Sequence, residues 1–190
     1  MKKLIILGHP AQESFCKSIA ETYLATAKQM GQEVELLNLA LLKFDPILHE
    51  GYKKVQELEP DLEHAKHLIS WADHLVWVYP NWWGAMPALM KGFIDRVFIP
   101  GYAFKYRQNS SLWDKLLTGK SAHLYVTMDS PPWYYNWVTK MPGHNQMKRA
   151  ILEFCGISPI KITNFGPLKG SSDSQRKKWL RLVAADAARN

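Results

Sequence analysis

The chain has 190 residues, of which 47% are hydrophobic and 22% are charged, and its formal net charge at pH 7 is +7. These values predict one globular domain over residues 1–190 with a full hydrophobic core, and they exclude a membrane-spanning protein because no apolar run is long enough. The basic residues are scattered, apart from the triplet Arg176-Lys177-Lys178, so the composition gives no reason to expect a nucleic-acid partner.

Apolar runs and amphipathic segments alternate along the chain. A continuous apolar run such as residues 3–8 is typical of a parallel strand that is buried on both faces. Ser14 fits the N-cap of the first helix, and Gly31 fits its end. In chain order, strands are predicted at 3–8, 33–38, 74–79, 120–127 and 160–165, and helices at 14–30, 60–71, 87–98, 146–154 and 172–188, the last with caps from Ser171-Ser172-Asp173.

Five strands joined by crossover helices predict a doubly wound α/β fold with helices on both faces of a parallel sheet. In a chain of this length the flavodoxin-like strand order 2-1-3-4-5 is favoured. That order brings together the loops after the first, third and fourth strands, at residues 8–14, 79–87 and 127–143. The link at residues 39–59 is long and irregular, and such links are uncommon without a role.

The two cysteines, Cys16 and Cys155, form neither a disulfide framework nor a metal site. We expect both to be reduced thiols of a cytoplasmic protein. The apolar stretch behind Met1 is too short for a signal peptide and is better explained as the first strand. The seven histidines show no metal-ligand spacing with carboxylates, so we expect no metal.

The first loop ends at a helix N-terminus, where unpaired N–H groups and the helix dipole favour an anion. His9 adds a donor and Ser14 adds a hydroxyl, which together predict a site for a phosphate or pyrophosphate. A plain turn with a serine cap is the alternative. The sequence has neither a Walker P-loop nor a G-x-G-x-x-G motif, so an ATPase is not supported.

The other two loops are rich in proline and aromatic residues. The second loop is Pro80-Asn81-Trp82-Trp83-Gly84, and Pro87 after it is well suited to begin a helix. Its two tryptophans predict contact with a flat apolar ring such as an isoalloxazine, or burial against the sheet. The third loop carries Trp133-Tyr134-Tyr135-Asn136-Trp137, which predicts either the wall of a pocket for a flat substrate or a subunit interface.

These motifs resemble the NAD(P)H:quinone oxidoreductase family of flavodoxin-like flavoproteins. The family includes modulator-of-drug-activity and general-stress proteins and the ancillary subunits of potassium-efflux systems. The resemblance covers most of the chain and is strongest from Tyr79 to Phe98, which contains Pro87-Ala88-Leu89-Met90-Lys91-Gly92-Phe93. Shorter matches are His9-Pro10 with Ser14-Phe15, Gly101-Tyr102-Ala103-Phe104 and Phe154-Cys155-Gly156.

The resemblance implies a non-covalent flavin, with FAD favoured over FMN because many members use the first loop for a pyrophosphate. It also implies the reaction, in which a hydride passes from NAD(P)H to the flavin and a quinone or similar flat acceptor is then reduced by two electrons. Tyr135 and His144 are implied to assist this transfer. The residues implied to bind the flavin are His9, Ser14, Phe15 and Cys16 near the phosphate, Pro80, Asn81, Trp82 and Trp83 along the isoalloxazine, and Thr127, Met128 and Asp129 at the pyrimidine edge and ribityl chain.

Two departures from the family pattern concern the site. Cys16 stands where many relatives have asparagine, and Met128, Asp129 and Ser130 stand where many have two glycines after the threonine. Because glycine allows close approach of the backbone, the second departure predicts altered substrate preference, weaker flavin binding or lost activity.

The resemblance leaves one further function open and implies an assembly. The alternative function is a flavin-binding regulatory subunit that docks on a cytoplasmic-facing potassium-efflux transporter without significant turnover. The expected assembly is a homodimer, because the aromatic residues of 133–137 and of 98–106 are too many to leave in water on a small monomer.

Overall fold

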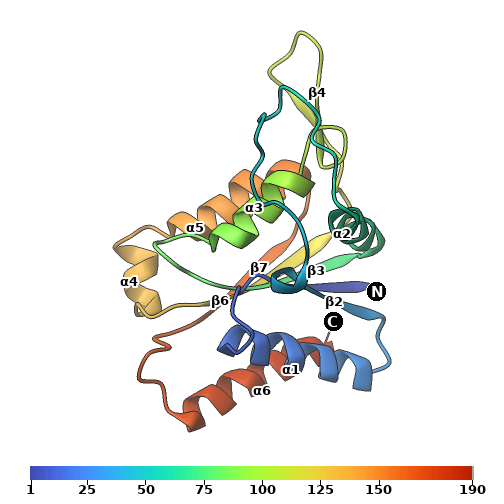
Figure 1. Ribbon diagram of the computed structural model, residues 1–190. Coiled ribbons are helices and arrows are strands. Elements are labelled where there is room, and N and C mark those ends of the chain that lie inside the picture. The colour runs from blue at the N-terminus through green and yellow to red at the C-terminus, as the bar shows by residue number, and fades with distance from the viewer. Residues whose placement is uncertain (190) are drawn as a thin grey trace.

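The computed structural model describes residues 1–189 and has a five-stranded parallel sheet at its centre (Figure 1). The strand order is β2-β1-β3-β6-β7, so the predicted doubly wound, flavodoxin-like order 2-1-3-4-5 is confirmed. The strands are β1 (Lys3–Leu7), β2 (Val34–Asn38), β3 (His74–Pro80), β6 (Ser121–Thr127) and β7 (Ile160–Phe165).

Helices cover both faces of the sheet (Figure 1). On one face lie α1 (Phe15–Gln29) and α6 (Asp173–Arg189), which contact each other. On the other face lie α2 (Pro60–Trp71), α3 (Ala88–Val97) and the π-helical segment η2 (Gln146–Glu153). The short elements are η1 (Leu39–Leu41), α4 (Pro132–Trp137), α5 (Pro142–Asn145) and the hairpin of β4 (Phe104–Tyr106) and β5 (Trp113–Lys115).

The strands are apolar without interruption because both of their faces are buried. In β1, Leu4 and Ile6 belong to the core beneath α2, α3 and η2, whereas Ile5 and Leu7 belong to the core beneath α1 and α6. Burial of such side chains contributes about 25 cal/mol for each Å² of apolar surface removed from water. Within residues 1–189, no helix has the length and apolar character that a membrane crossing requires.

The predicted helix ends are confirmed at both caps of α1. The Ser14 hydroxyl accepts the Lys17 N–H at 3.2 Å, and Gly31 ends the helix at φ 69°. The first turn of α6 is capped in the same way, by the Ser172 hydroxyl on the Gln175 N–H at 3.2 Å.

The hairpin and α4 were not predicted from the sequence. Strands of three residues are too short to show an alternating pattern. The α4 segment follows Pro131, begins with Pro132 and is mostly aromatic. These residues have poor helix propensity, so the sequence predicted a loop there.

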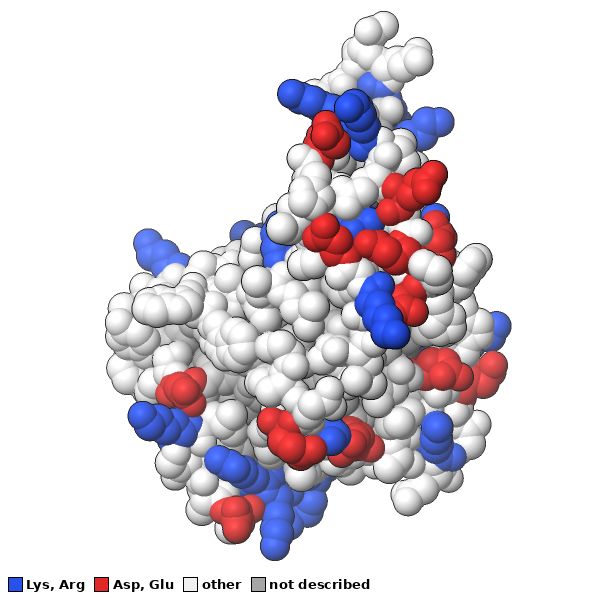
Figure 2. Space-filling model, viewed as in Figure 1, with Lys and Arg blue, Asp and Glu red and all other residues white. Residues whose placement is uncertain are grey.

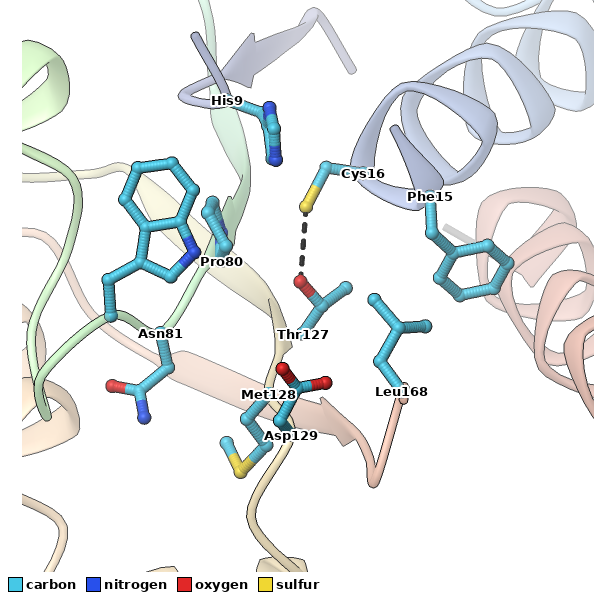
Figure 3. A pocket seen from close by; sticks show the side chains of 10 residues that line it. His9, Phe15, Cys16, Pro80, Asn81, Thr127, Met128, Asp129 and Leu168 are labelled. Atoms are coloured by element: carbon cyan, nitrogen blue, oxygen red, sulfur yellow. Dashed lines mark hydrogen bonds between the residues drawn. The ribbon is translucent and has the colours of Figure 1, made fainter. Parts of the chain in front are cut away.

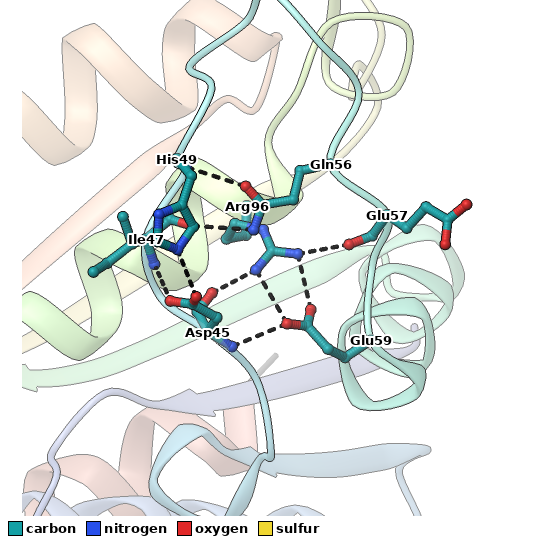
Figure 4. A network of polar contacts seen from close by, with 7 residues as sticks. All are labelled: Asp45, Ile47, His49, Gln56, Glu57, Glu59 and Arg96. Carbon is teal, nitrogen blue, oxygen red and sulfur yellow. Dashed lines mark hydrogen bonds and ion pairs between the residues drawn. The ribbon is translucent and has the colours of Figure 1, made fainter.

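The connector at residues 42–59 is held against α3 by a glycine and an arginine one helical turn apart. A Cβ at Gly92 would collide with Pro46, so only glycine lets the connector approach this closely. Arg96 is 1% exposed and points from α3 into the connector (Figure 4).

The Arg96 guanidinium binds three groups of the connector. It donates to the Asp45 and Glu57 carbonyls and pairs with the Glu59 carboxylate, with Nη2 and Oε2 2.9 Å apart. Burial by itself would raise the pKa of Glu59, but hydrogen bonds from Asp45 and Arg96, with the charge of Arg96, hold that pKa below its ordinary value. A buried cation therefore fixes the connector in place, in addition to the apolar contacts that Leu42, Phe44 and Leu58 make with the core.

We expect Arg96→Met to lower the free energy of unfolding by about 3 kcal/mol, because it leaves Glu59 and two carbonyls without their cation. Urea denaturation measures this loss, and proteolysis within residues 42–59 should accelerate. Arg107→Met is the matched control, since Arg107 pairs with Asp114 at 2.6 Å but both side chains are about half exposed. That change should cost less than about 1 kcal/mol. Equal losses in the two variants would contradict the anchoring role of Arg96.

Candidate functional site

The three loops predicted to converge do so at the carboxyl ends of β1, β3 and β6, where they enclose a hollow of about 370 Å³ that opens to solvent (Figure 3). We call this hollow the first pocket. Of the flavin-binding residues implied by the sequence, only Ser14 and Trp83 do not line it. The lining residues are His9, Phe15, Cys16, Pro80, Asn81, Trp82, Thr127, Met128, Asp129 and Leu168.

The first loop presents backbone donors at the start of α1. The Ser14 hydroxyl and carbonyl accept the N–H groups of Lys17 and Ser18, each at 3.2 Å. Phe15 and Cys16 are the first two residues of α1, so no earlier carbonyl of the helix is placed to accept their N–H groups. The helix start therefore offers two donors and the positive end of its dipole to an anion.

His9 contributes a neutral imidazole to the first pocket. Its Nδ1 accepts the Ala11 N–H at 3.0 Å, so the neutral ring carries its hydrogen on Nε2. Burial lowers the pKa of His9 below its ordinary value, which keeps the ring uncharged near pH 7. The ring meets Trp82 edge to face at 5.5 Å and points into the pocket (Figure 3).

Cys16 and Thr127 form the floor of the pocket (Figure 3). The Cys16 Sγ lies 3.3 Å from the Thr127 Oγ1, and both residues are almost completely buried. Burial raises the pKa of Cys16 to about 12, so its thiol stays protonated and is no nucleophile. Cys16 therefore acts as a small packing residue where many relatives have an amide.

The second loop is a tight turn that separates its two tryptophans. Trp82 and Ala85 exchange two backbone hydrogen bonds of 2.9 Å, while Trp83 and Gly84 have φ values of 53° and 78°. Two successive residues with positive φ define a type I′ turn, which is strained for a tryptophan. Trp82 lines the pocket, whereas Trp83 is fully exposed and does not.

The third loop is bound to its two neighbours through the backbone. The Thr127 carbonyl accepts the Asn81 N–H at 2.7 Å, and the Met128 carbonyl accepts the Leu168 N–H at 2.9 Å. Asp129 accepts the Lys169 N–H at 2.9 Å and is the only carboxylate in the lining, which contains no Lys or Arg.

Leu168 is the lining residue that sequence reasoning missed. It comes from the loop after β7, which leaves the same edge of the sheet. A usable signal was Gly166, where a Cβ would collide with Met128 and thus block the approach of the two loops.

Tyr135 and His144, the two implied catalytic residues, lie behind the second loop and do not line the first pocket. The Tyr135 hydroxyl donates to the Gly84 carbonyl at 3.3 Å and accepts the Gly143 N–H at 2.9 Å. The His144 Nε2 lies 2.8 Å from the Asn164 Oδ1, and the Tyr135 and His144 rings meet edge to face at 4.9 Å. Tyr135 therefore holds the turn that carries Trp82, and His144 packs against the Tyr135 ring.

A second hollow begins at Phe15, which lines both, and extends between α1 and α6. Its lining holds two cations, Arg176 and Lys177, two carboxylates, Glu13 and Asp173, and the hydroxyls of Ser14 and Ser18. The Arg176 guanidinium lies 6.0 Å from the centre of the Phe15 ring. The first pocket thus suits a flat, mostly apolar group, and the second hollow is polar with charges of both signs. Residues 1–189 contain no group of three or more His, Cys, Asp or Glu side chains that could hold a metal ion.

Comparisons with known proteins agree with this architecture. The sequence profile of a family described as the flavodoxin-like fold matches residues 1–186. An uncharacterized NAD(P)H oxidoreductase of Haemophilus influenzae is 30% identical over 190 residues, which cover 97% of this chain and 93% of that protein.

Solved structures show the same fold. A crystal structure from Streptococcus mutans has a TM-score of 0.85 at 33% identity and covers 100% of both chains. An NAD(P)H:quinone oxidoreductase from Methanothermobacter marburgensis has a TM-score of 0.82 at 23% identity, covering 99% of this chain and 96% of that one. An FMN-dependent NADH-azoreductase from Bacillus anthracis, solved with FMN, has a TM-score of 0.75 at 20% identity and covers 100% and 99%. At these identities the last two show the fold alone.

We expect Tyr135→Phe to lower the free energy of unfolding by about 1–2 kcal/mol, because the buried Gly143 N–H loses its acceptor. Thermal unfolding measures the loss. Tyr134→Phe is the matched control: its side chain is 42% exposed, and the change should be close to neutral. If the two variants unfold alike, the Tyr135 hydroxyl does not hold the turn.

Proposed function

The chain belongs to the family with the flavodoxin-like fold, and from this we propose that it is an enzyme, a flavin-dependent NAD(P)H:quinone oxidoreductase. The observation that carries the proposal is the first pocket, where three loops bring Trp82, His9 and backbone donors to one edge of the sheet. The names of the two oxidoreductase relatives support the same reaction class. Nothing in those names supports the regulatory alternative.

The donor set of the first pocket fits a flavin. An isoalloxazine has two apolar faces and a rim of nitrogen and oxygen atoms, and the pocket offers an indole wall at Trp82 and polar groups at His9 and Asn81. When bound, the flavin would take a hydride from NAD(P)H and deliver two electrons to a quinone.

The residues of this chain would position the ring and keep its surroundings defined. His9 presents Nε2–H as a fixed neutral donor, because Ala11 occupies its other nitrogen. Thr127 and Cys16 close the floor and exclude water from that side. Tyr135 would act as a positioning residue, since it fixes the turn from which Trp82 reaches the pocket, and His144 would support the Tyr135 ring.

We propose FAD as the preferred flavin. The second hollow shares Phe15 with the first and extends beside the start of α1, which gives room for a second phosphate and an adenosine; Arg176 and Lys177 would bind the phosphate, and the carboxylates of Glu13 and Asp173 would face the hydroxyls and amines of the nucleoside. FMN, the flavin of the azoreductase neighbour, would occupy the first pocket and the helix start only. The two free and buried cysteines are compatible with the reducing cytoplasm, which we propose as the location.

We also propose a homodimer that forms through the face between α3, η2 and the hairpin. A hollow of about 780 Å³ lies there, and its aromatic lining includes Phe98, Phe104 and Tyr106 from the stretch singled out in the sequence. No α4 residue lines this hollow.

Light scattering at micromolar concentration should therefore give twice the mass of the chain. Tyr106→Glu, which places a charge among these aromatic side chains, should give a monomer. Leu182→Glu on α6, at a site that is 51% exposed on the opposite side of the sheet, should leave the dimer intact. A wild-type monomer at these concentrations would refute the assembly.

Flavin binding distinguishes the two tryptophans of the second loop. We expect Trp82→Ala to weaken FAD binding about tenfold, because stacking on an aromatic ring contributes about 1–3 kcal/mol. Trp83→Ala, next to it but outside the pocket, should bind FAD as the wild type does. Titration of the flavin-free protein by fluorescence quenching measures both affinities.

Turnover of NADPH with menadione then tests the reaction itself. A saturable, flavin-dependent rate is expected. Retained flavin without turnover would refute the enzyme and leave a binding role, and the absence of any flavin binding would refute the proposed site.

A further inference from the structure

A group of exposed aromatic and aliphatic side chains borders the first pocket, and we call it the aromatic rim. Trp83 at the tip of the second loop is fully exposed, and Trp137 on α4 is 82% exposed. The other members are Trp133, Tyr134 and Val138, which are 63%, 42% and 54% exposed. Residues 133, 134, 137 and 138 share one side of the α4 turn, because neighbours three and four apart lie together on a helix. Water-exposed apolar clusters of this kind mark interaction sites.

The aromatic rim has a rigid base. Tyr135 on the opposite side of α4 is 2% exposed and ties the helix to Gly84 and Gly143 through its hydroxyl. The Trp133 and Tyr134 rings contact each other at 5.9 Å. With Tyr135 fixed inward, Trp133 and Trp137 cannot turn into the core.

The aromatic rim is also contiguous with the pocket. Trp83 lies between Trp82, which lines the pocket, and Gly84, whose carbonyl accepts the hydrogen bond from Tyr135 of α4. A surface that covers the rim therefore meets the pocket mouth.

The segment that carries most of the aromatic rim is basic, and one carboxylate, that of Asp129 at the pocket wall, directly precedes it. Residues 130–152 contain no Asp or Glu, but they contain Lys140, Lys148 and Arg149. Among residues 1–189, Lys140 and Arg149 form no ion pair. In Figure 2 the surface over α4 is largely uncharged, while acidic side chains lie at the upper right around the connector and along the lower part of the molecule, including one group at the lower left. The whole chain carries a net charge of +7.

We propose that the aromatic rim docks on the surface of an anionic lipid bilayer. Trp and Tyr favour the headgroup level, where the ring meets acyl chains and the N–H or O–H stays hydrated. Lysines and arginines beside such rings are attracted to anionic headgroups. The rings protrude separately from the second loop and from α4, and a fluid surface can accommodate rings that are spaced in this way. A second copy of the chain is better matched by the concave hollow between α3 and η2.

Docking would place the pocket mouth at the bilayer surface, next to the acyl chains in which apolar quinones dissolve. We infer that the acceptor is a lipid-dissolved quinone, an inference that rests on the proposed function. The docking itself does not, because it depends only on the rim and its cations.

Cosedimentation with phosphatidylcholine vesicles, with and without phosphatidylglycerol, tests the docking. We expect the dimeric protein to bind the phosphatidylglycerol vesicles, less so at high salt. Trp133→Ala/Trp137→Ala should weaken binding about tenfold or more, since affinity scales with the apolar area buried. The matched control is Leu41→Ala/Leu182→Ala, which removes side chains that are 62% and 51% exposed outside the rim and should bind as the wild type does. Thermal unfolding verifies that both variants are folded.

Two results would overturn the proposal. One is no binding of the wild type to phosphatidylglycerol vesicles, and the other is equal binding by the wild type and the Trp133→Ala/Trp137→Ala variant. If instead the wild type does not bind vesicles and the variant differs from it in mass by light scattering, the rim is an interface between copies of the chain. Because cosedimentation needs no flavin, vesicle binding by a protein that lacks turnover would refute the proposed function alone.

Discussion

The burial of the central strands on both faces is the constraint on which the rest of the structure depends. Strand β3 is buried along its whole length, and β1 is as well, so of their side chains only Pro80, at the carboxyl end of β3, reaches the first pocket. Polar chemistry is thereby restricted to the ends of the sheet. At the carboxyl edge the chain leaves β1, β3 and β6 in neighbouring loops, and the backbone groups released there form the first pocket. The same arrangement explains why its lining is largely backbone and aromatic, with charge provided by α6 beyond it.

Toward the opposite end of the sheet, the same burial encloses polar side chains and lowers their pKa values. Lys3 is fully buried, and burial lowers its pKa, while its Nζ donates to Gln32 at 2.6 Å. Burial also lowers the pKa of His74 and of His123 to about 4, so both stay neutral. Each keeps one hydrogen bond, to Ser121 and Thr163. These side chains are buried in their strands, and their partners lie on the neighbouring strand or just before it: Ser121 on β6 for His74, Thr163 on β7 for His123, and Gln32 ahead of β2 for Lys3.

Sequence reasoning recovered the strands and helices because apolar periodicity reports burial directly. It also recovered most of the pocket, since the strand order brings the same three loops together in any flavodoxin-like sheet. It did not place Tyr135, because in a segment of consecutive aromatic residues no pattern says which ring turns inward. Nor did it find Leu168, whose loop reaches the pocket only through the close approach of Gly166 to Met128. Both omissions concern contacts between loops, and such contacts produce no periodic pattern of residues in a sequence.

The replacement of two glycines in the third loop is explained by those contacts. Met128 is 3% exposed, and its N–H and carbonyl bind Phe165 and Leu168, so its backbone is fixed to the loop after β7. Asp129 is fixed by the Lys169 N–H in the same way. The glycine that close approach requires lies across the gap, at Gly166. In this chain the residue without a side chain at this contact is Gly166, and the carboxylate of Asp129 lies at the pocket wall. A flavin bound here would thus meet a carboxylate where many relatives have two glycines, which favours the neutral over the anionic form of whatever group lies beside Asp129.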